Sequence, residues 1–374
     1  MPASAHTSKF PIRHVAIIGT GLIGGSWALA LKRHAPDVQV TACDRPSVLA
    51  VLTSRGGCDH GVADPVQAVA DADLVILAPP LAFLEQILRT ISPHVRRDAL
   101  VTDVGSVKTG IGEVADKLLP GRFVGGHPMA GSEFAGVTHA SPLLFENAAY
   151  ALCPTPASTK HRRFEALVEL IDTIGARALS LDARAHDLAA AHVSHVPQLL
   201  AIALTNAVGT HTRVEPMTRL LAGGGFRDMT RIASSPYGTW AGILAANTPA
   251  IRHALASVRA QLDQLEAALA ADDTDALKAD FDAANQTRHD VPNRRKGLLR
   301  AYPELLLHAV DRPGFLAEVF VALAQAELNV KDVELLLVRE GTGGSFRLAF
   351  ASDDEIGRAL TALEDAGFSA ERKA

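Results

Sequence analysis

Short runs of β-branched and other apolar residues alternate with amphipathic segments through the first half of the chain. Four of these runs are HVAII (14–18), VQVTAC (38–43), DLVILA (73–78) and ALVTDV (99–104). Apolar runs with helical patterns between them are typical of parallel strands that helices cover on both faces. They predict a doubly wound α/β domain over residues 12–181, which closes with a strand at 148–154, a helix near 158–174 and a strand at 176–181.

The pattern changes at about Asp182. Strand signals disappear, and helix formers dominate to about Leu299. Residues 255–273 carry apolar side chains at three- and four-residue steps, as an amphipathic helix does. The pattern predicts an all-helical domain over residues 182–299. By analogy with helical domains that follow α/β domains in other proteins, we expect it to bind the substrate and to form a homodimer.

A third pattern begins at residue 300. Strand-like segments alternate there with helical patterns that begin at Pro313 and near residue 353. The segments are YPELLLHAV, LNVKDVELLLVRE, GSFRLAFAS and FSAER. The resulting order is βαββαβ, which is that of a ferredoxin-like module. We therefore expect three domains in all, of which the third covers residues 300–374.

The composition is that of an ordinary globular protein. The chain has 374 residues, of which 48% are hydrophobic and 21% are charged, so intrinsic disorder is not expected. The formal net charge of -5 argues against nucleic acid as a partner. An anionic small-molecule substrate remains compatible with this charge if arginines bind it locally.

Three features favour a cytoplasmic protein. Cys43, Cys58 and Cys153 lack metal or disulfide spacing, so we expect reduced thiols. The first ten residues have no apolar core, so no signal peptide is expected. The longest stretch without Asp, Glu, Lys or Arg, 188–212, contains histidines, glutamine and asparagine and is too polar to span a bilayer. We expect it to form a buried helix and expect no membrane partner.

A glycine-rich loop follows the first predicted strand. In VAIIGTGLIGGS, the residues Gly19, Gly21 and Gly24 have the GxGxxG spacing between a strand and a helix at 22–34. These glycines permit a tight turn, close approach of a pyrophosphate, and packing of helix on strand, as in a Rossmann-type domain. The amides at the helix start, including those of Leu22 and Ile23, favour phosphate. The loop therefore predicts a bound dinucleotide.

An acidic residue lies at the spacing that selects the dinucleotide. Asp44 comes twenty residues after Gly24 and ends the second strand. Its carboxylate can accept hydrogen bonds from both ribose hydroxyls and would repel a 2′-phosphate, which favours NAD. Arg45 follows directly and could receive such a phosphate, so NADP stays open.

Two further stretches leave strands at the carboxyl edge of the predicted sheet, where ligands of doubly wound domains bind. LAPPL (77–81) places Pro79 beside the expected cofactor, and DVGSVK (103–108) presents Ser106 and Lys108 at a helix start. Ser106 is a candidate for contact with cofactor and substrate. Capping of the helix is the alternative for this serine, and the two roles are compatible.

A histidine lies in the stretch VGGHPMAGSE (124–133) at the same edge. Gly125 and Gly126 let the backbone approach a ligand, and Pro128 restricts His127 to extended conformations. We expect a stiff loop here. Because an imidazole titrates near neutrality, His127 is a candidate base that takes a proton from an alcohol as hydride leaves the same carbon. A purely structural histidine is the alternative.

The helical region contributes two polar stretches. In HDLAAAHVSHVPQ (186–198), the residues His192, His195 and Gln198 are three apart and are expected on one helix face. No carboxylate or cysteine completes a metal-binding set with them, so no metal is expected. In GGGFRDMTRIA (223–233), Arg227 and Arg231 lie four apart among apolar residues, so we expect at least one of them to be buried and to bind a carboxylate.

These motifs, in this order, resemble the prephenate dehydrogenase family over residues 12–296. They are GLIGGS, DVGSVK, GHPMAGSE, HDLAAAHVSHVPQ and GGGFRDMTRIA. The resemblance implies an oxidoreductase of tyrosine biosynthesis that uses NAD to convert prephenate to 4-hydroxyphenylpyruvate and carbon dioxide. It implies that His127 accepts the hydroxyl proton, that Ser106 contacts the same hydroxyl, and that Arg231 holds a substrate carboxylate. It also implies a polar network around the pocket made of His195, Glu133 and Asp228.

One position departs from the family pattern. Gln198 stands where the family often has histidine in its SHxPH motif. If this position contacts the substrate side chain, the change bears on the choice between prephenate, which carries a keto acid there, and arogenate, which carries an amino acid. We favour prephenate, and arogenate stays open.

The last domain resembles an ACT domain, an amino-acid-sensing unit, through AVDRPGFLAEVF and LNVKDVELL. The resemblance implies an effector site near Asp311, Gly314 and Asn329, for which tyrosine is our hypothesis. A module that serves only packing or dimerisation is the alternative.

Two other functions compete with this interpretation. Another hydroxyacid or imino-acid dehydrogenase of the same fold would be expected to carry a lysine base on its helical domain, and residues 182–251 contain no lysine. A non-catalytic nucleotide and amino-acid sensor is the second alternative. The presence of Ser106, His127 and Arg231 argues against it.

Overall fold

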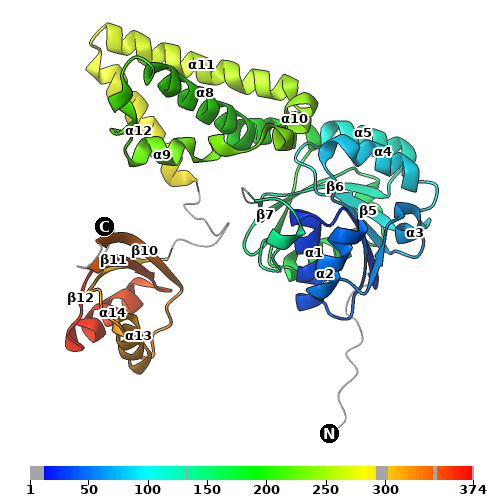
Figure 1. The fold of residues 1–374 in the computed structure, drawn as a ribbon, viewed down its shortest axis with the longest axis horizontal. Helices are drawn as coiled ribbons and strands as arrows, with labels where there is room; N and C mark the ends of the chain where they lie inside the picture. The colour runs from blue at the N-terminus through cyan, green and yellow to red at the C-terminus, as the bar shows by residue number, and fades with distance from the viewer. Residues whose placement is uncertain (1–11, 132–133, 292–301, 340–342, 373–374) are drawn as a thin grey trace. The chain divides into compact units, whose positions relative to one another are not determined.

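Eight strands form the sheet that follows the N-terminus. The computed structural model describes residues 12–131, 134–291, 302–339 and 343–372 (Figure 1). The strands are β1 (His14–Ile18), β2 (Gln39–Cys43), β3 (His60–Val62), β4 (Leu74–Leu77), β5 (Leu100–Asp103), β6 (Phe123–Pro128), β7 (Ala149–Pro154) and β8 (Arg177–Ser180). Their order is β3-β2-β1-β4-β5-β6-β7-β8. All neighbours pair in parallel except β6 and β7, which are antiparallel.

Six α-helices accompany these strands in the described part of this domain. They are α1 (Leu22–His34), α2 (Pro46–Ser54), α3 (Pro65–Val69), α4 (Leu81–Ile91), α5 (Thr109–Leu118) and α6 (Phe164–Thr173). Successive residues of β1 alternate between two hydrophobic cores. Val15 and Ile17 pack with Trp27 of α1, whereas Ala16 and Ile18 pack with Leu88 of α4. Both faces of the sheet are therefore covered, as the apolar runs predicted.

The predicted strands and the helix at 22–34 are confirmed. The helix expected near 158–174 is shorter. A 3₁₀ turn occupies Ser158–Lys160, and α6 begins only at Phe164. Ser158 is buried and bonds to Thr155, so a local turn takes up the residues before the helix.

The following region consists of helices joined by turns, with no strand among its described residues. Its elements are α7 (Ala183–Ala190), a π-helical turn (Ala191–His195), α8 (Val196–His211), a 3₁₀ turn (Pro216–Arg219), α9 (Gly224–Thr230), a second 3₁₀ turn (Arg231–Ser234), α10 (Tyr237–Ala246), α11 (Thr248–Ala270) and α12 (Thr274–Asp290). The predicted helical pattern at 255–273 belongs to α11. The all-helical character of this region agrees with the sequence pattern.

One continuous helical run, Ala183–His211, is long and apolar enough to span a membrane by length and composition alone. The sequence predicted that its stretch 188–212 is a buried helix, and this prediction is only partly right. Leu188, Val193 and Ile202 are exposed, whereas His195 and Gln198 are buried. His195 and Gln198 therefore face the interior of the protein, and part of the apolar face is uncovered in the single chain.

The last part of the chain forms a separate unit, which begins at residue 299. Its elements are β9 (Glu304–Ala309), α13 (Phe315–Gln325), β10 (Asp332–Arg339), β11 (Gly343–Ala349), α14 (Asp353–Asp365) and β12 (Ser369–Arg372). The strands form an antiparallel sheet of order β10-β11-β9-β12. Both helices lie on one face of this sheet around Leu307, Val319 and Leu363 (Figure 1). The predicted βαββαβ order is confirmed.

Candidate active site

The glycine loop between β1 and α1 is shaped by close backbone contacts. Gly19 has φ +87°, and a Cβ there would lie 2.7 Å from backbone atoms of Ala78 and Pro79. A Cβ on Gly24 would lie 2.0 Å from the carbonyl oxygen of Gly19. No side chain caps the start of α1 at Gly21, so its first amides remain available for a phosphate. The loop therefore fits the pyrophosphate of a dinucleotide, and Pro79 lies against it.

Asp44 ties the end of β2 to this loop. Its carboxylate accepts hydrogen bonds from the amide of Thr20 at 2.7 Å and from the amide of Arg45 at 2.7 Å. A carboxylate has about four acceptor positions, so these bonds leave capacity for ribose hydroxyls. The Arg45 side chain is 83% exposed. The geometry thus holds an acid at the position that favours NAD.

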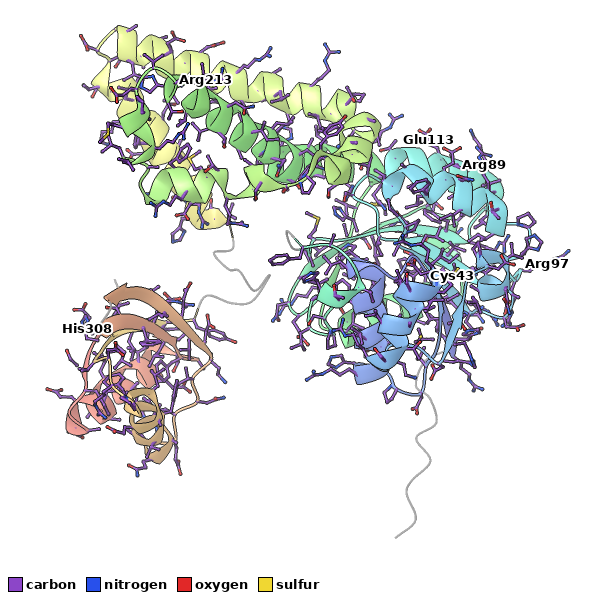
Figure 2. The ribbon with its side chains drawn as sticks, in the orientation of Figure 1. Cys43, Arg89, Arg97, Glu113, Arg213 and His308 are labelled. Carbon is purple, nitrogen blue, oxygen red and sulfur yellow. The ribbon has the colours of Figure 1, made fainter. Side chains whose placement is uncertain are left out.

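A buried thiol lies directly before this acid. Figure 2 shows Cys43 within the nucleotide-binding region, and its side chain is buried. Burial, together with the charge of Asp44, raises the pKa of the Cys43 thiol to about 11. The thiol therefore stays protonated and unreactive near neutrality.

His127 lies in a strand, which corrects the expectation of a loop. It is the fifth residue of β6, and it pairs with Ala151 of the antiparallel strand β7. Because Pro128 also pairs, with Tyr150, the ladder extends past the histidine. A Cβ on Gly126 would lie 2.5 Å from the carbonyl oxygen of Asp103, so the preceding glycine is needed for packing against β5.

The imidazole of His127 belongs to a chain of three polar side chains. Its Nδ1 lies 2.9 Å from Nε2 of His186, and Nδ1 of His186 lies 2.9 Å from Oδ1 of Asp187. His186 and Asp187 are buried residues of α7, whereas His127 is partly buried. Among the described residues, no hydrogen-bond partner is found for Nε2 of His127. The nitrogen that remains available is therefore the one opposite His186.

Asp187 also holds the start of α5. Its carboxylate accepts hydrogen bonds from the amides of Lys108 at 2.7 Å and Thr109 at 2.8 Å. Capping of α5 was the alternative role for Ser106, and Asp187 binds these amides instead. The serine is partly buried and does not cap α5, so its hydroxyl is not committed to that role.

A buried ion pair lies beneath the histidine. The Lys108 ammonium bonds to the carboxylate of Asp103 and donates to the carbonyl oxygen of Gly126 at 2.7 Å. The same carboxylate accepts hydrogen bonds from the amides of Gly105 and Gly126. The pair therefore fixes the end of β5 against β6. Lys108 serves this role rather than presenting its charge at the edge of the sheet, as its position in the sequence suggested.

His127 and His195 favour the neutral form. Burial, with smaller contributions from the charges of Lys108 and His186, holds the pKa of His127 well below its ordinary value of 6.5. Burial also lowers the pKa of His195. For Asp187, burial opposes ionisation, but hydrogen bonds from His186, Thr109 and Lys108 outweigh it and lower the pKa. The geometry thus combines a neutral imidazole with an ionised carboxylate.

His195 presents a buried donor without a partner. Asn247 donates through Nδ2 to the backbone oxygen of Asp187 at 2.8 Å, and the same Nδ2 lies 3.2 Å from Nδ1 of His195. Because Nδ2 can only donate, Nδ1 of His195 accepts, and the proton resides on Nε2. This Nε2 is buried and has no hydrogen-bond partner among the described residues. A buried unpaired donor is costly, which is typical of a position that a ligand satisfies.

The three polar residues expected on one helix face are separated. His195 and Gln198 are buried, but His192 is exposed and bonds to the carbonyl oxygen of Leu188. The π-helical turn at Ala191–His195 changes the angular spacing between them, and such turns often occur at functional sites. Gln198 donates through Nε2 to the carbonyl oxygen of Ile232 at 2.9 Å, which leaves its Oε1 as an acceptor.

The prediction that Arg227 or Arg231 is buried is wrong for the single chain. Both are exposed, as is Asp228. Of the apolar neighbours on which the prediction rested, Met229 is 66% exposed, whereas Phe226 and Ile232 are partly buried. Glu133 lies outside the described residues.

Comparisons with known proteins agree with this geometry. Residues 27–180 match the family model of the prephenate dehydrogenase nucleotide-binding domain, and residues 182–283 match that of the prephenate dehydrogenase dimerization domain. The prephenate dehydrogenase of Bacillus subtilis is 34% identical over 357 residues, which cover 94% of this chain and 95% of that relative. The chain belongs to the prephenate dehydrogenase family. It is an NAD-dependent dehydrogenase.

Solved structures of prephenate and arogenate dehydrogenases share the fold. Prephenate dehydrogenase from A. aeolicus, in complex with hydroxyphenyl propionate and NAD+, is 27% identical with a TM-score of 0.70 and covers 76% of this chain and 100% of that chain. Synechocystis arogenate dehydrogenase is 30% identical with a TM-score of 0.67 and covers 75% of this chain and 100% of that chain. Both matches span about three quarters of this chain, whereas the Bacillus subtilis match spans nearly all of it.

Sequence reasoning missed several polar residues that organise this site. They are Asp103, His186, Asp187 and Asn247. One signal was present, since Asp187 is the last acidic residue before the long uncharged stretch from 188 to 212. An acidic residue next to a helix with buried polar side chains is a candidate partner for buried donors.

The C-terminal unit contains its own cavity, of about 440 Å³. Asp311 and Gly314, two of the predicted effector residues, line it with Phe315, Leu335 and Phe346. Gly314 has φ +83° and directly precedes α13, which agrees with the predicted tight turn. Asn329 is exposed and is not among the lining residues, so the cavity brings together two of the three.

Proposed function

We propose that this chain oxidatively decarboxylates prephenate to 4-hydroxyphenylpyruvate with NAD, and that His127 is the catalytic base. The observation that carries the proposal is the orientation of one imidazole. Its Nδ1 is engaged by His186, its Nε2 is available, and it lies on β6 at the carboxyl edge of a sheet whose first loop fits a dinucleotide. Membership of the prephenate dehydrogenase family supports the reaction.

The cofactor is proposed to lie along the carboxyl edge of the sheet. The residues proposed to hold it are Gly19, Gly21, Leu22, Ile23, Gly24, Asp44, Pro79 and Ser106. NAD, when bound, accepts a hydride from the ring carbon that bears the substrate hydroxyl. The narrow turn at Gly19 and the uncapped start of α1 support this placement.

His127 is proposed to take the hydroxyl proton at Nε2 as the hydride departs. A neutral imidazole is required for this step, and the lowered pKa of His127 keeps it neutral. Ser106, which does not cap α5, is proposed to contact the same hydroxyl. Loss of the ring carboxylate as carbon dioxide then makes the ring aromatic, so the reaction is effectively irreversible.

Five residues are proposed to bind the substrate, namely Arg231, His195, Gln198, Glu133 and Asp228. The unpaired Nε2–H of His195 supports its role, because a substrate oxygen would satisfy this buried donor. The guanidinium of Arg231 suits a substrate carboxylate. Gln198 supports the turn that begins at Arg231 through its bond to Ile232.

The preference for prephenate over arogenate is tested by absorbance at 340 nm with NAD and then with NADP. We expect larger kcat/KM for prephenate with NAD. A larger kcat/KM for arogenate would contradict the proposed substrate. A larger kcat/KM with NADP would contradict the role proposed for Asp44. No turnover with either substrate contradicts the proposed reaction.

A homodimer built through the helical domain is the proposed assembly. The match to a dimerization domain and a set of exposed apolar side chains support it. These side chains are Leu188, Val193, Ile202, Leu220, Leu221, Met229, Tyr237, Leu262, Leu269 and Phe281. The proposed domain limits are residues 12–181, 182–299 and 300–374. Free Cys43, Cys58 and Cys153 support a cytoplasmic location.

We also propose that the C-terminal unit is an ACT domain that binds tyrosine as an effector. The cavity lined by Asp311, Gly314 and Phe315 supports a small amphipathic ligand. Calorimetric titration of the full chain with tyrosine, with phenylalanine as the control ligand, tests this. We expect heat of binding for tyrosine and a change in kcat or KM. The absence of heat together with unchanged kinetics contradicts it.

A further inference from the structure

The chain from His127 through His186 to Asp187 has a fixed direction. An ionised carboxylate can only accept hydrogen bonds, so Nδ1 of His186 must donate to Asp187. When His186 is neutral it has one N–H, which makes its Nε2 an acceptor. Nδ1 of His127, which lies 2.9 Å from that Nε2, must then be the donor. The lone pair of His127 is thereby placed on Nε2.

We propose that His186 and Asp187 are positioning residues that hold His127 as the Nδ1–H tautomer and so prepare its Nε2 to accept a proton. That this proton comes from the substrate hydroxyl rests on the proposed function. The tautomer itself follows from the contacts of the three side chains when His186 is neutral. Neither residue was among the candidates from the sequence.

The carboxylate that sets this direction is firmly held. Its two oxygens accept hydrogen bonds from the amides of Lys108 and Thr109, and the backbone oxygen of Asp187 accepts one from Asn247. Asp187 and His186 are 5% and 3% exposed, so water does not compete for these bonds. Rotation of the carboxylate would break two bonds to α5, so the acceptor stays aimed at His186.

The arrangement also suits the charge that forms during the reaction. When Nε2 of His127 takes a proton, the ring becomes an imidazolium that still donates from Nδ1 to His186. The Asp187 carboxylate lies one imidazole away and offsets the new charge. The same side chains therefore orient the base before the step and stabilise it afterwards, as in other chains of histidine and carboxylate.

The first test uses Asp187→Asn, because an amide can donate to His186 and so reverse the chain. In the wild-type enzyme, nitrogen-15 NMR of the imidazoles, with His127 assigned through His127→Asn, should show the Nδ1–H tautomer at neutral pH. Asp187→Asn should lose this tautomer and lower kcat roughly 10²–10⁴-fold, with KM changed only a few-fold.

The matched control is Asp182→Asn, since Asp182 caps α7 through the amides of Arg184 and Ala185 and does not contact the imidazoles. The control should keep both tautomer and kcat.

A second pair of variants applies if Asp187→Asn does not fold. A glutamine at position 186 can accept from His127 and donate to Asp187, whereas a leucine can do neither. His186→Gln should therefore retain a kcat at least about tenfold above that of His186→Leu. Equal losses in the two variants, or an unchanged tautomer and kcat in folded Asp187→Asn, overturn the proposal.

These outcomes are distinct from a failure of the proposed function. If His127→Asn retains full turnover, His127 is not the base, whatever its tautomer. If His127→Asn is inactive and the other variants keep the wild-type tautomer and kcat, the base stands and the positioning role of His186 and Asp187 is wrong.

Discussion

The nucleotide-binding region and the helical region are stabilised in different ways. The central strands of the first are fully buried, with Val75, Ile76 and Leu77 at 0% exposure. The second leaves large apolar side chains uncovered, with Leu221 at 81% and Val193 at 68%. The first region therefore completes its own core, whereas the second leaves an apolar surface of the kind that a partner can cover. The site draws on both, since His127 comes from the sheet and His186 from α7.

The largest expected effect concerns His127, which the nucleotide-binding region contributes to the site. His127→Asn should lower kcat roughly 10²–10⁴-fold, because a neutral amide cannot accept the hydroxyl proton, while substrate affinity is largely kept. Steady-state kinetics with prephenate and NAD measure this. His94→Gln is the control, since His94 is an exposed residue of the same region. Turnover that survives His127→Asn would place the base elsewhere.

The next effect concerns the region that leaves apolar side chains exposed in the single chain. Arg231→Ala should raise KM for prephenate by roughly 30-fold or more, the lower range for removing one partner of a shielded charge pair, with a smaller change in kcat. Arg231 is exposed in the single chain, so this effect requires that substrate and a second surface enclose it. An unchanged KM would remove Arg231 from the pocket. Arg213→Ala is the control, because Arg213, which is labelled in Figure 2, is an exposed arginine of the same helical region.

A smaller effect is expected at the uncovered apolar surface itself. Leu221→Asp should raise the dissociation constant of the homodimer by about tenfold or more, because a carboxylate would become buried without a partner. Sedimentation velocity over a dilution series measures this constant. Leu143→Asp, at a 48% exposed leucine of the nucleotide-binding region, should leave it unchanged. Equal behaviour of the two variants would contradict the proposed dimer surface.

The same contrast explains which features the sequence could predict. The strands, the glycine loop and Asp44 depend on local spacing, and they were found. The place of His127 in β6 depends on pairing with the distant strand β7, so a loop was expected instead. The proposed positioning residues were not found because their contacts are distant in sequence. His186 contacts His127 across 59 positions, and Asp187 contacts Lys108 across 79 positions, and no local pattern encodes such contacts.

The error at Arg231 has a different origin. Apolar neighbours in a sequence predict burial, but they do not tell whether the same chain or another one provides it. In the nucleotide-binding region the same chain provides the burial, so apolar runs correctly predicted buried strands. In the helical region it does not bury every apolar residue, and Met229 and Leu221 are exposed.

The pH dependence of kcat/KM tests the central claim most directly, because it reports the ionisation of the free enzyme's base. The base must be neutral to act, and the pKa of His127 lies well below its ordinary 6.5, mainly through burial. The account predicts that kcat/KM of the wild-type enzyme for prephenate is still at its plateau at pH 6.5 and falls only at more acidic pH. The residual activity of His127→Asn should lack this fall. An acidic limb centred at or above pH 6.5 that persists unchanged in His127→Asn would contradict it.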